Sequence, residues 1–546
     1  MKRSLDSINN TEFDVVIIGA GIYGSSLAWS CSRVGLKVCL IEKHDFGSGV
    51  SANSHRLIYG GLQYLMDLDF LSTIQSKNER KRLMKIAPHL VNPKKCILPF
   101  YNKGLNRKSV LWLGLKVFDF ISFDRNIDME NSKKIGASKI ISKSKTVASF
   151  PFLLKKDLGG SAVWSDSFCN NTERLVLSFI KTATRKKTIA LNYVEAVNYE
   201  IINNEIKAVK VKDLISGNLF DINTKFVINS SGYESNSLFV SNLSHNTGEW
   251  IGGINLVISK LYDKDFTIGL RSPGKDSKMY VATSWNNFTI IGTEWYNLDS
   301  NNFEVTEDKC LQFIEKFNKT FPNANVSGND ILYVFSGIIP ARDGKALKKE
   351  RILAESEHEI SNLIDVIGVQ YTTAAGVSEK VVKMLSKRFD FTWISKNFKQ
   401  LVGGEIKDLN EFIKYYYNTW GNRYPKKLIR NVINNYGSES ENIFQYAEEF
   451  RRKGSDIDES ILFAKVFFAV ENEMALKLTD VIFRRTNIGF TNEFGEIQIE
   501  KIAKFMQQRC NWTELRMKNE IAGVYSYYPD FIKKWTRNNN FQQSEN

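Results

Sequence analysis

Short apolar runs and loops of small residues alternate over residues 1–65 of the chain. An apolar run at Val15–Ile18 is followed by G-A-G-I-Y-G at residues 19–24, and a second apolar run ends at Glu42. The segment between these runs has the pattern of a helix. This order predicts a strand, a glycine-rich turn, a helix and a second strand, which open an α/β fold.

The three glycines of this turn predict a dinucleotide site. Gly19 allows the tight turn, Gly21 lets backbone N–H groups approach a pyrophosphate, and Gly24 allows close packing of helix and strand. The pyrophosphate would rest on the positive N-terminal end of the helix. Glu42, about twenty residues further on, is placed to accept a hydrogen bond from a ribose hydroxyl. The alternative is a purely structural α/β turn, which the surrounding context disfavours.

A second loop of small and polar residues follows Glu42. Residues 44–54 read H-D-F-G-S-G-V-S-A-N-S, where an NAD enzyme of this type usually continues into another helix and strand. Such a loop lets a chain run along a ribityl group and a pyrophosphate to an isoalloxazine ring. We therefore predict FAD as the cofactor, with Ser51 and Ser54 among its contacts.

The next residues carry a family resemblance. Residues 54–65 read S-H-R-L-I-Y-G-G-L-Q-Y-L, which resembles the S-S-K-L-I-H-G-G-L-R-Y-L signature of FAD-dependent glycerol-3-phosphate dehydrogenases. Similar segments recur from about residue 12 to about residue 515. Among them are N-S-S-G at 229–232, F-T-I-I-G-T-E-W at 288–295 and the D-x-x-x-R-R-T pattern at 480–486. The chain is identified as a member of this family.

The resemblance implies an α/β fold with a Rossmann-like FAD-binding domain, interleaved with an α+β substrate domain that contains an antiparallel sheet, over residues 12–390. Residues 391–408 would form a linker, residues 409–530 a C-terminal all-α domain and residues 531–546 a disordered tail. Alternating apolar positions at 196–213 favour the sheet, and helical periodicity beyond residue 409 favours the helices. Asp480, Arg484 and Arg485 lie in one predicted helix and are interpreted as a structural ion-pair cluster.

Five further residues are predicted to contact FAD. They are Val194, Gly232, Gly368, Thr372 and Thr373. The two threonines should begin a helix aimed at the pyrimidine edge of the flavin, where the positive helix end would stabilise negative charge on the reduced ring.

At the positions where the family pattern offers cationic or proton-transferring groups, this sequence mostly offers neutral ones. Gln63 and Ile339 stand where the family has Arg, and Gln370 stands where it has Lys. Tyr59 stands where the family has His, and Trp295 where it has an acid. In the family's K-G-S-H segment, Gly252 replaces the Lys and Asn255 replaces the His. Losing two charge-assisted phosphate contacts would cost about 3–6 kcal/mol, or two to four decades of affinity. The comparison predicts a substrate that is larger or less anionic than glycerol 3-phosphate.

Five residues are candidates for catalysis: His55, Arg56, Tyr59, Glu294 and Arg342. His55 would act as a base, hydrogen-bond the flavin, carry it covalently or serve only the structure. Arg342 would supply a displaced phosphate contact or lie on the surface. The predicted reaction is oxidation of an alcohol, of glycerol or sugar origin, by hydride transfer to flavin. The alternatives are a glycerol-3-phosphate dehydrogenase with rearranged contacts, an amine-oxidising flavoenzyme and a flavin-binding protein without turnover.

Composition and charge limit the kinds of partner and the cell compartment that are expected for the chain. The 546 residues carry a net charge of +14, but no nucleic-acid-reading motif is present. The six cysteines have no paired spacing, which argues against disulfides and a metal site and favours a reducing compartment. Residues 1–14 lack a hydrophobic signal region, so a cytoplasmic location is expected. Residues 106–121 have a basic start, a Trp and a dense apolar face, which fits an interfacial helix or a buried one. The resemblance implies peripheral contact with an anionic membrane at its inner face and delivery of electrons to quinone.

Overall fold

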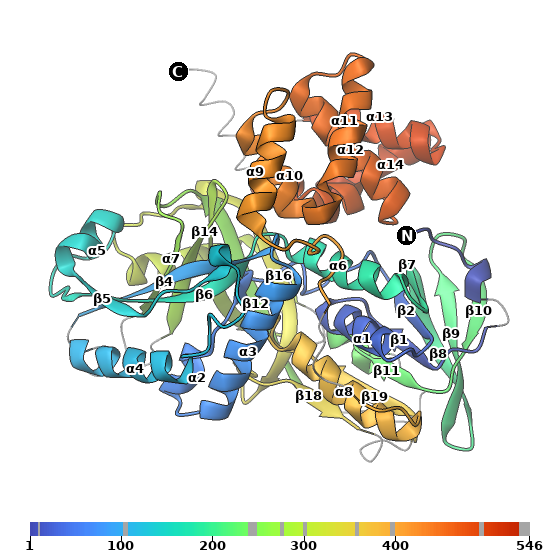
Figure 1. The fold of residues 1–546 in the computed structure, drawn as a ribbon, viewed down its shortest axis with the longest axis horizontal. Helices are drawn as coiled ribbons and strands as arrows, with labels where there is room; N and C mark the ends of the chain where they lie inside the picture. The colour runs from blue at the N-terminus through green and yellow to red at the C-terminus, as the bar shows by residue number, and fades with distance from the viewer. Residues whose placement is uncertain are drawn as a thin grey trace.

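The computed structural model describes residues 1–546 with the exception of 9–10, 102–106, 238–247, 273–277, 299–302, 355–359, 394–398, 491–495 and 534–546. Within the described residues, a mostly parallel sheet, a large mostly antiparallel sheet and a group of C-terminal helices form three connected parts (Figure 1). This arrangement confirms the predicted fold class.

The parallel sheet has the strand order β18-β19-β11-β1-β2-β7, and only the β18–β19 pair is antiparallel. Its strands are β1 (Val15–Ile18), β2 (Val38–Glu42), β7 (Thr188–Asn192), β11 (Val227–Asn229), β18 (Arg351–Leu353) and β19 (Leu363–Ile367). Three helices pack together beside it: α1 (Ile22–Arg33), α6 (Thr172–Thr184) and α8 (Ala374–Arg388). Because burial covers these strands on both sides, they read as continuous apolar runs in the sequence.

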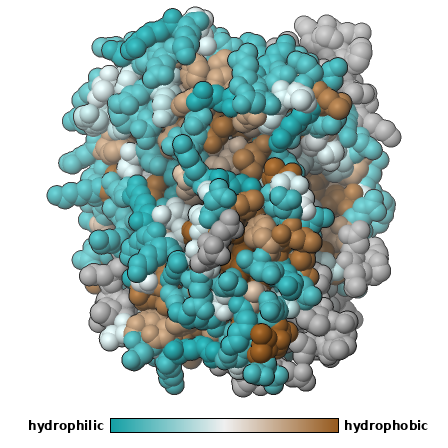
Figure 2. Space-filling view, turned by 90° about the vertical axis from the view of Figure 1, so that its right-hand side faces the viewer, coloured by the Kyte–Doolittle hydropathy of each residue, from teal (hydrophilic) through white to brown (hydrophobic). Residues whose placement is uncertain are grey.

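A small antiparallel sheet flanks this domain and is formed by β8 (Val194–Ile202), β9 (Glu205–Asp213) and β10 (Leu219–Asn223). It stands at the right-hand side of Figure 1. Seen from that side, the molecule is covered mostly by hydrophilic side chains, with apolar residues in scattered patches between them (Figure 2).

The second large sheet has the strand order β17-β16-β12-β15-β14-β13-β4-β6-β3, with β5 paired to β6. Its strands are β3 (Leu57–Ile58), β4 (Val91–Phe100), β5 (Lys139–Ser142), β6 (Gly160–Cys169), β12 (Glu249–Ser259), β13 (Phe266–Arg271), β14 (Met279–Trp285), β15 (Phe288–Asn297), β16 (Ile331–Arg342) and β17 (Lys345–Ala346). Its strands come from chain segments that lie between those of the parallel sheet, so the two domains are interleaved. Helix α7 (Glu307–Thr320) packs its apolar side chains into the core of this sheet.

The C-terminal part is helical, as the periodicity predicted. Its helices are α9 (Leu409–Trp420), α10 (Lys426–Tyr436), α11 (Ser440–Arg452), α12 (Ile457–Asn472), α13 (Glu496–Cys510) and α14 (Glu514–Ser526). Helices α9 to α12 share their own apolar core, whereas α13 and α14 contribute to the core of the large antiparallel sheet. The ring of Tyr333 on β16, for example, contacts Phe483 and Tyr528. The C-terminal part therefore packs against the substrate domain.

Residues inside the predicted linker and the predicted tail pack into the protein. Leu401 and Val402, inside the predicted linker, are buried, and the Leu401 N–H donates to the Ile86 carbonyl oxygen. Phe531 and Ile532, inside the predicted disordered tail, are also buried, since both join the core of the large sheet. The rest of that tail and residues 394–398 of the linker lie outside the described residues.

The described chain segments between β3 and β6 contain four α-helices. They are α2 (Leu62–Met66), α3 (Phe70–Ile86), α4 (Lys108–Ile121) and α5 (Lys143–Ser149). Of the apolar residues of α4, Leu115 and Phe118 are buried, whereas Trp112, Leu113 and Phe120 are exposed. The buried alternative for this segment is thus contradicted over most of the helix. Within the described residues, no helix is both long and apolar enough to cross a membrane.

Candidate active site

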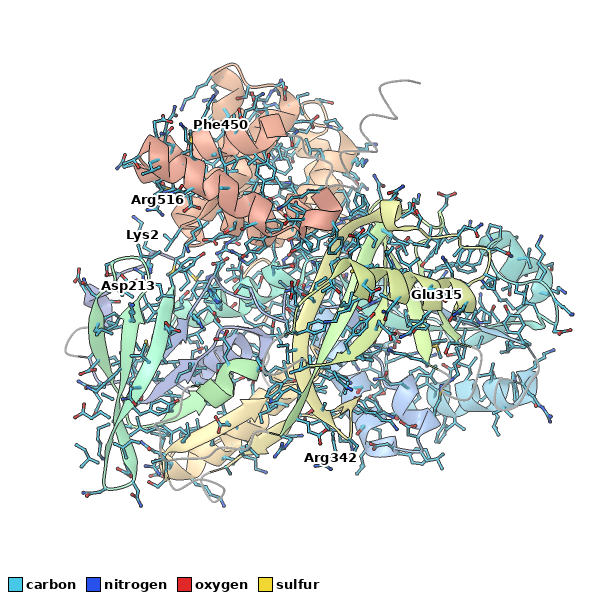
Figure 3. All side chains as sticks on the ribbon, turned by 180° about the vertical axis from the view of Figure 1, so that it is seen from behind. Lys2, Asp213, Glu315, Arg342, Phe450 and Arg516 are labelled. Carbon is cyan, nitrogen blue, oxygen red and sulfur yellow. The ribbon has the colours of Figure 1, made fainter. Side chains whose placement is uncertain are left out.

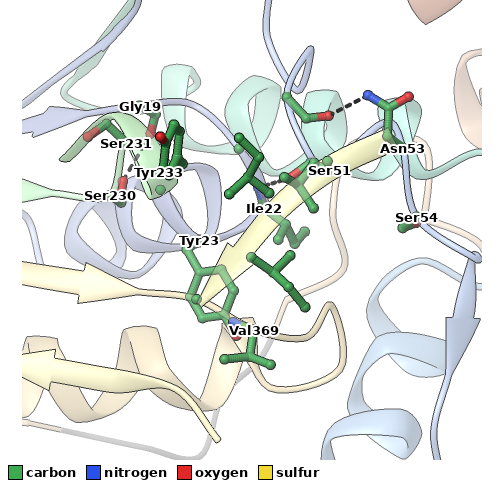
Figure 4. Close-up of a pocket in the computed structure, with 18 of the residues that line it drawn as sticks. Gly19, Ile22, Tyr23, Ser51, Asn53, Ser54, Ser230, Ser231, Tyr233 and Val369 are labelled. Carbon is green, nitrogen blue, oxygen red and sulfur yellow. Dashed lines mark hydrogen bonds between the residues drawn. The ribbon is translucent and has the colours of Figure 1, made fainter. Parts of the chain in front are cut away.

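One cavity of about 1000 Å³ runs between the two interleaved domains. Its first end, here the cofactor end, is lined by the glycine turn after β1, Glu42, Val194 and Gly232. Figure 4 shows Gly19, Ile22 and Ser51 in this wall. Its second end, here the substrate end, is lined by Tyr59, Trp250, Trp295, Phe303 and Ile339. The second small-residue loop, residues 44–56, lies along the cavity between them.

At the cofactor end, the backbone packs too closely for residues larger than glycine. A Cβ on Gly24 would lie 1.8 Å from the Gly19 carbonyl oxygen, and Gly19 itself has a φ of +90°. Gly21 precedes α1 and provides no side-chain cap, so the positive N-terminal end of the helix borders the cavity without a capping side chain from this position. The Ile22 N–H donates to Ser51 Oγ at 3.0 Å, which joins the turn to the second loop. These features fit the pyrophosphate of a dinucleotide.

Glu42 connects the two loops of the cofactor end. Its Oε2 accepts from the Ala20 N–H at 2.8 Å, and its Oε1 accepts from the His44 N–H at 2.9 Å. Burial raises the pKa of this carboxyl group above its usual value. The carboxylate lines the cavity where the sequence predicted a ribose contact, and that contact stays a prediction.

Most of the other predicted cofactor contacts line the same cavity. These are Ser51, Ser54, Val194, Gly232, Gly368 and Thr372. Thr372 Oγ1 also accepts from the Tyr59 N–H at 3.1 Å. Thr373 does not line the cavity; it precedes α8, and its Oγ1 lies 2.9 Å from the Tyr23 hydroxyl.

Two tyrosines of the cofactor end were not predicted. The Tyr23 hydroxyl accepts from the Val369 and Gln370 N–H groups, each at 3.2 Å, and its ring packs against Gly368 (Figure 4). The Tyr371 hydroxyl donates to the Ser51 carbonyl oxygen at 2.9 Å. Tyr23 occupies a variable position of the glycine turn, and its partners lie about 350 residues later, so local motif analysis carries no signal for it.

His55 is held by side chains in the cavity wall. Its Nε2 lies 2.9 Å from Thr283 Oγ1, and its Nδ1 lies 3.3 Å from Asn255 Oδ1. Thr293 Oγ1 donates to the same Asn255 oxygen at 2.7 Å. Burial lowers the pKa of His55 to about 4, so the imidazole is neutral at pH 7. Hydrogen-bond partners at both ring nitrogens hold the imidazole in one orientation, and covalent attachment of FAD stays an untested alternative.

Arg56 and Tyr59 also line the cavity, but only the Tyr59 side chain is free of an ion pair. The Arg56 guanidinium donates to both carboxylate oxygens of Glu173, at 2.8 and 3.1 Å, and stacks 4.4 Å from the Trp285 ring. Both partners of this ion pair are fully buried, so the cation is already neutralised. Burial raises the pKa of Tyr59, which keeps its phenol protonated and able to donate a hydrogen bond.

The two remaining catalytic candidates lie elsewhere. Thr293 and Trp295 line the cavity, but Glu294 between them points to the other face of β15, because successive strand residues alternate. There it binds Tyr280, Lys278 and Lys316 at 2.6, 2.8 and 3.0 Å. Arg342 is exposed at the end of β16, outside the cavity wall and at the lower edge of the molecule (Figure 3). Neither residue is retained as catalytic.

The predicted ion-pair cluster is confirmed, and its main partner lies on the cofactor loop. Arg484 and Arg485 both donate to Asp45, at 2.5 Å for Arg484 Nε and 2.6 and 2.8 Å for Arg485. Arg484 also pairs with Asp480 at 2.6 Å. All four side chains are almost completely buried. The C-terminal part thereby holds the first residues of the loop that lines the cavity.

The opposite end of that loop is held near the same C-terminal segment. Glu173, which binds Arg56, also accepts from Asn487 Nδ2 at 3.5 Å. The Phe490 ring centroid lies 5.5 Å from the Arg56 guanidinium. Residues 480–490 therefore contact both anchors of the cofactor loop.

Comparisons with known proteins agree with this site. Residues 14–384 match the family described as FAD dependent oxidoreductase, and residues 395–517 match the C-terminal domain of alpha-glycerophosphate oxidase. The chain is 29% identical to the glycerol-3-phosphate dehydrogenase of Synechocystis, over 96% of this chain and 98% of the relative. It is 28% identical to the mitochondrial glycerol-3-phosphate dehydrogenase of Mus musculus, over 95% and 74%.

The fold is shared with a solved relative. The structure of glycerol-3-phosphate dehydrogenase from Bacillus halodurans, complexed with FAD, covers 96% of each chain with a TM-score of 0.77 at 20% identity. The glycine cradle, the uncapped helix end and these relatives agree that FAD is the cofactor. The chain therefore belongs to the FAD-dependent oxidoreductase family and is related over most of its length to the glycerol-3-phosphate dehydrogenases.

Proposed function

We propose that the substrate end of the cavity oxidises the CH–OH group of a small molecule that is not glycerol 3-phosphate. The observation that carries the proposal is the continuity of the cavity, which leads from the glycine cradle to the neutral polar group His55, Asn255 and Thr293. FAD, when bound, supplies the hydride acceptor. Neutral hydrogen-bonding side chains suit a hydroxyl group better than a phosphate dianion.

His55 is the group that we assign to the hydroxyl proton. Its neutral imidazole is the protonation state that can accept a proton, and alcohol oxidation must release one. Asn255 uses its oxygen for His55 and Thr293, while its Nδ2 has no hydrogen-bond partner among the described residues. That amide can donate to the substrate oxygen, and the Tyr59 phenol is a second donor in the same wall.

Anaerobic flavin reduction tests the assignment. The purified protein is mixed with candidate polyols, and the loss of visible flavin absorbance is followed. His55→Gln should slow reduction by about 10²–10⁴ while FAD content stays unchanged. Thr146→Val, which alters a buried threonine far from the cavity, is the control. Equal rates for His55→Gln and the unaltered protein would remove His55 from the proton step.

The same experiment separates the alternatives. Reduction by amines but not alcohols would favour an amine-oxidising enzyme. Reduction by dithionite alone, with every candidate donor inactive, would favour a flavin-binding protein without turnover. Rapid reduction by glycerol 3-phosphate would favour the activity named for the relatives.

We further propose that the edge formed by α2, α3 and α4 docks on an anionic membrane surface at its inner face, where quinone would take the electrons. Helices α2 and α4 contact each other. Together with adjoining residues the three helices expose ten large apolar side chains, each 41–81% exposed: Met66, Leu68, Phe70, Leu71, Ile74, Val110, Trp112, Leu113, Phe120 and Phe123. Exposed Arg107, Lys108 and Lys116 accompany them. A cluster of this size differs from the scattered apolar residues of the face in Figure 2.

Sedimentation with phosphatidylglycerol vesicles tests this docking. Leu71→Glu combined with Phe120→Glu should abolish binding, because both side chains are at least 80% exposed at the centre of the proposed contact. Leu515→Glu combined with Leu219→Glu adds the same two charges at exposed leucines of α14 and β10 and should leave binding unchanged. Equal binding by all variants would contradict the proposal.

A further inference from the structure

Among the described residues that line the cavity, the lysine and arginine side chains are already paired. Lys43 lies at the cofactor end and binds Glu195 and Glu234, each at 3.3 Å. Arg56 is neutralised by Glu173 inside the protein. The undescribed segments that adjoin lining residues in the sequence, 238–247 and 299–302, contain neither lysine nor arginine. An anionic group at the substrate end would therefore lack a cationic partner from these residues.

Aromatic rings occupy the space that two glycines leave open at the substrate end. A Cβ on Gly252 would lie 2.2 Å from the Phe303 ring, and a Cβ on Gly253 would lie 2.6 Å from the Trp295 ring. A side chain at either position would displace a ring. The family pattern places a lysine at position 252. Here a glycine takes that position, and the Phe303 ring takes the space of the side chain.

The rest of this wall is apolar or neutral. Ile338, Ile339 and Leu347 also line it, and Tyr59 contributes a protonated phenol. Burial of a dianion against such a wall is unfavourable, because no charge replaces its hydration. Aromatic and aliphatic side chains instead bind the apolar face of a ligand, while a few polar groups orient it.

We propose that the substrate is an uncharged alcohol that carries a ring or another apolar group where glycerol 3-phosphate carries its phosphate. The apolar group contacts Trp295 and Phe303, and the hydroxyl faces His55, Asn255 and Thr293. This inference rests on the proposed function, and the oxidation step is the same. The carbinol C–H and O–H bonds break and a C=O bond forms; the hydride reduces FAD and the proton goes to His55.

A pair of ligands that differ only at this group tests the inference. Glycerol 3-phosphate and 3-phenoxy-1,2-propanediol share the diol and differ in carrying a phosphate or a phenyl ether. Each is titrated anaerobically into the FAD-loaded protein, and binding is followed by the shift of the flavin absorption bands. The phenyl ether should bind tighter by about tenfold or more. Equal or tighter binding of glycerol 3-phosphate, or no binding of the phenyl ether, would overturn the inference.

Variants of the wall test the same inference by changing the protein instead of the ligand. Ile339→Arg returns a cation to a position that lines the cavity and should tighten glycerol 3-phosphate binding by about tenfold or more. Ile339→Leu is its matched control and should change neither ligand. Trp295→Ala should weaken the phenyl ether selectively. If the unaltered protein binds glycerol 3-phosphate as well as Ile339→Arg does, a cation is already present and the inference fails.

The outcomes also separate this inference from the proposed function. Binding of the phenyl ether without loss of flavin absorbance would support the substrate class and contradict oxidation of this alcohol. Loss of flavin absorbance with glycerol 3-phosphate, at low concentration, would support alcohol oxidation and contradict the uncharged substrate.

Discussion

The two ends of the cavity are built in different ways. At the cofactor end, backbone amides, a carboxylate and hydroxyl groups are fixed by short hydrogen bonds and by glycines that leave no space for a Cβ. At the substrate end, bulky rings and aliphatic side chains form the wall, and Arg56, which lines the same cavity, is already paired. The first end determines that a flavin is held, and the second determines which donor reaches it. A chain can therefore keep the reaction class of its family while it changes the substrate.

The two ends also differ in what supports them. The cofactor loop is anchored by buried ion pairs that reach the C-terminal segment 480–490. The substrate end is supported mainly by packing between strands and rings. Charge removal should therefore damage the cofactor end most, whereas changes of side-chain size should affect the substrate end alone.

The largest effect is expected for Asp45→Asn. The substitution leaves Arg484 and Arg485 with weakened partners in a fully buried site, which should lower the free energy of unfolding by about 3–5 kcal/mol. Urea denaturation followed by tryptophan fluorescence measures it. The control is Glu471→Gln, which removes the acid of the half-exposed pair with Arg509 and should cost less than about 1 kcal/mol. Similar costs for both variants would refute the special role of the Asp45 anchor.

The next effect concerns the glycine cradle. Gly24→Ala places a methyl group 1.8 Å from the Gly19 carbonyl oxygen, and backbone cannot move aside cheaply. FAD affinity should fall by about a hundredfold, which corresponds to about 3 kcal/mol. The ratio of flavin to protein absorbance after dialysis measures the loss. Gly523→Ala in α14, where a Cβ meets nothing within 4 Å, should retain FAD.

Acid should weaken the same anchors. The neighbouring arginines lower the pKa of Asp45 to about 2, although burial opposes the shift. Glu473 is a second buried acid, in the C-terminal part, paired with Arg174 and Lys181 of α6 at 2.7 and 3.2 Å, and these cations lower its pKa to about 2 against the effect of burial. The stability from each group is present above the ordinary carboxyl pKa of about 4 and is lost as pH falls through the folded value. We expect Asp45 to contribute about 2 kcal/mol and Glu473 about 3 kcal/mol. Unfolding curves between pH 5 and 2 should be flatter for Asp45→Asn; an unchanged slope would contradict the linkage.

The sequence predicted the local part of this site well. The glycine turn, Glu42 and Ser51 lie within forty residues and are recognisable because short motifs carry their geometry. Glu294 shows a limit that was avoidable, since strand alternation places it opposite its cavity-lining neighbours Thr293 and Trp295. Arg56 illustrates another limit, because its partner Glu173 is 117 residues away.

The C-terminal anchors illustrate a limit that no local pattern removes. Asp480, Arg484 and Arg485 were predicted to pair with one another, but their principal partner, Asp45, lies about 440 residues earlier in the chain. Only the packing of the C-terminal helices against the interleaved domains brings these charges together. No local pattern in the sequence encodes such a contact.

The smallest effect distinguishes the two ends most directly. Tyr371→Phe removes the hydrogen bond to the Ser51 carbonyl oxygen and should weaken FAD binding by about 1 kcal/mol, roughly fivefold. Trp295→Phe, the matched change of an aromatic side chain at the substrate end, should alter FAD affinity by less than about twofold, because it removes no contact of the cofactor loop. Fluorescence titration of the apoprotein with FAD compares both. An equal loss of FAD affinity in the two variants would mean that the substrate and cofactor ends are energetically coupled. The conclusion that the two ends act separately would then be wrong.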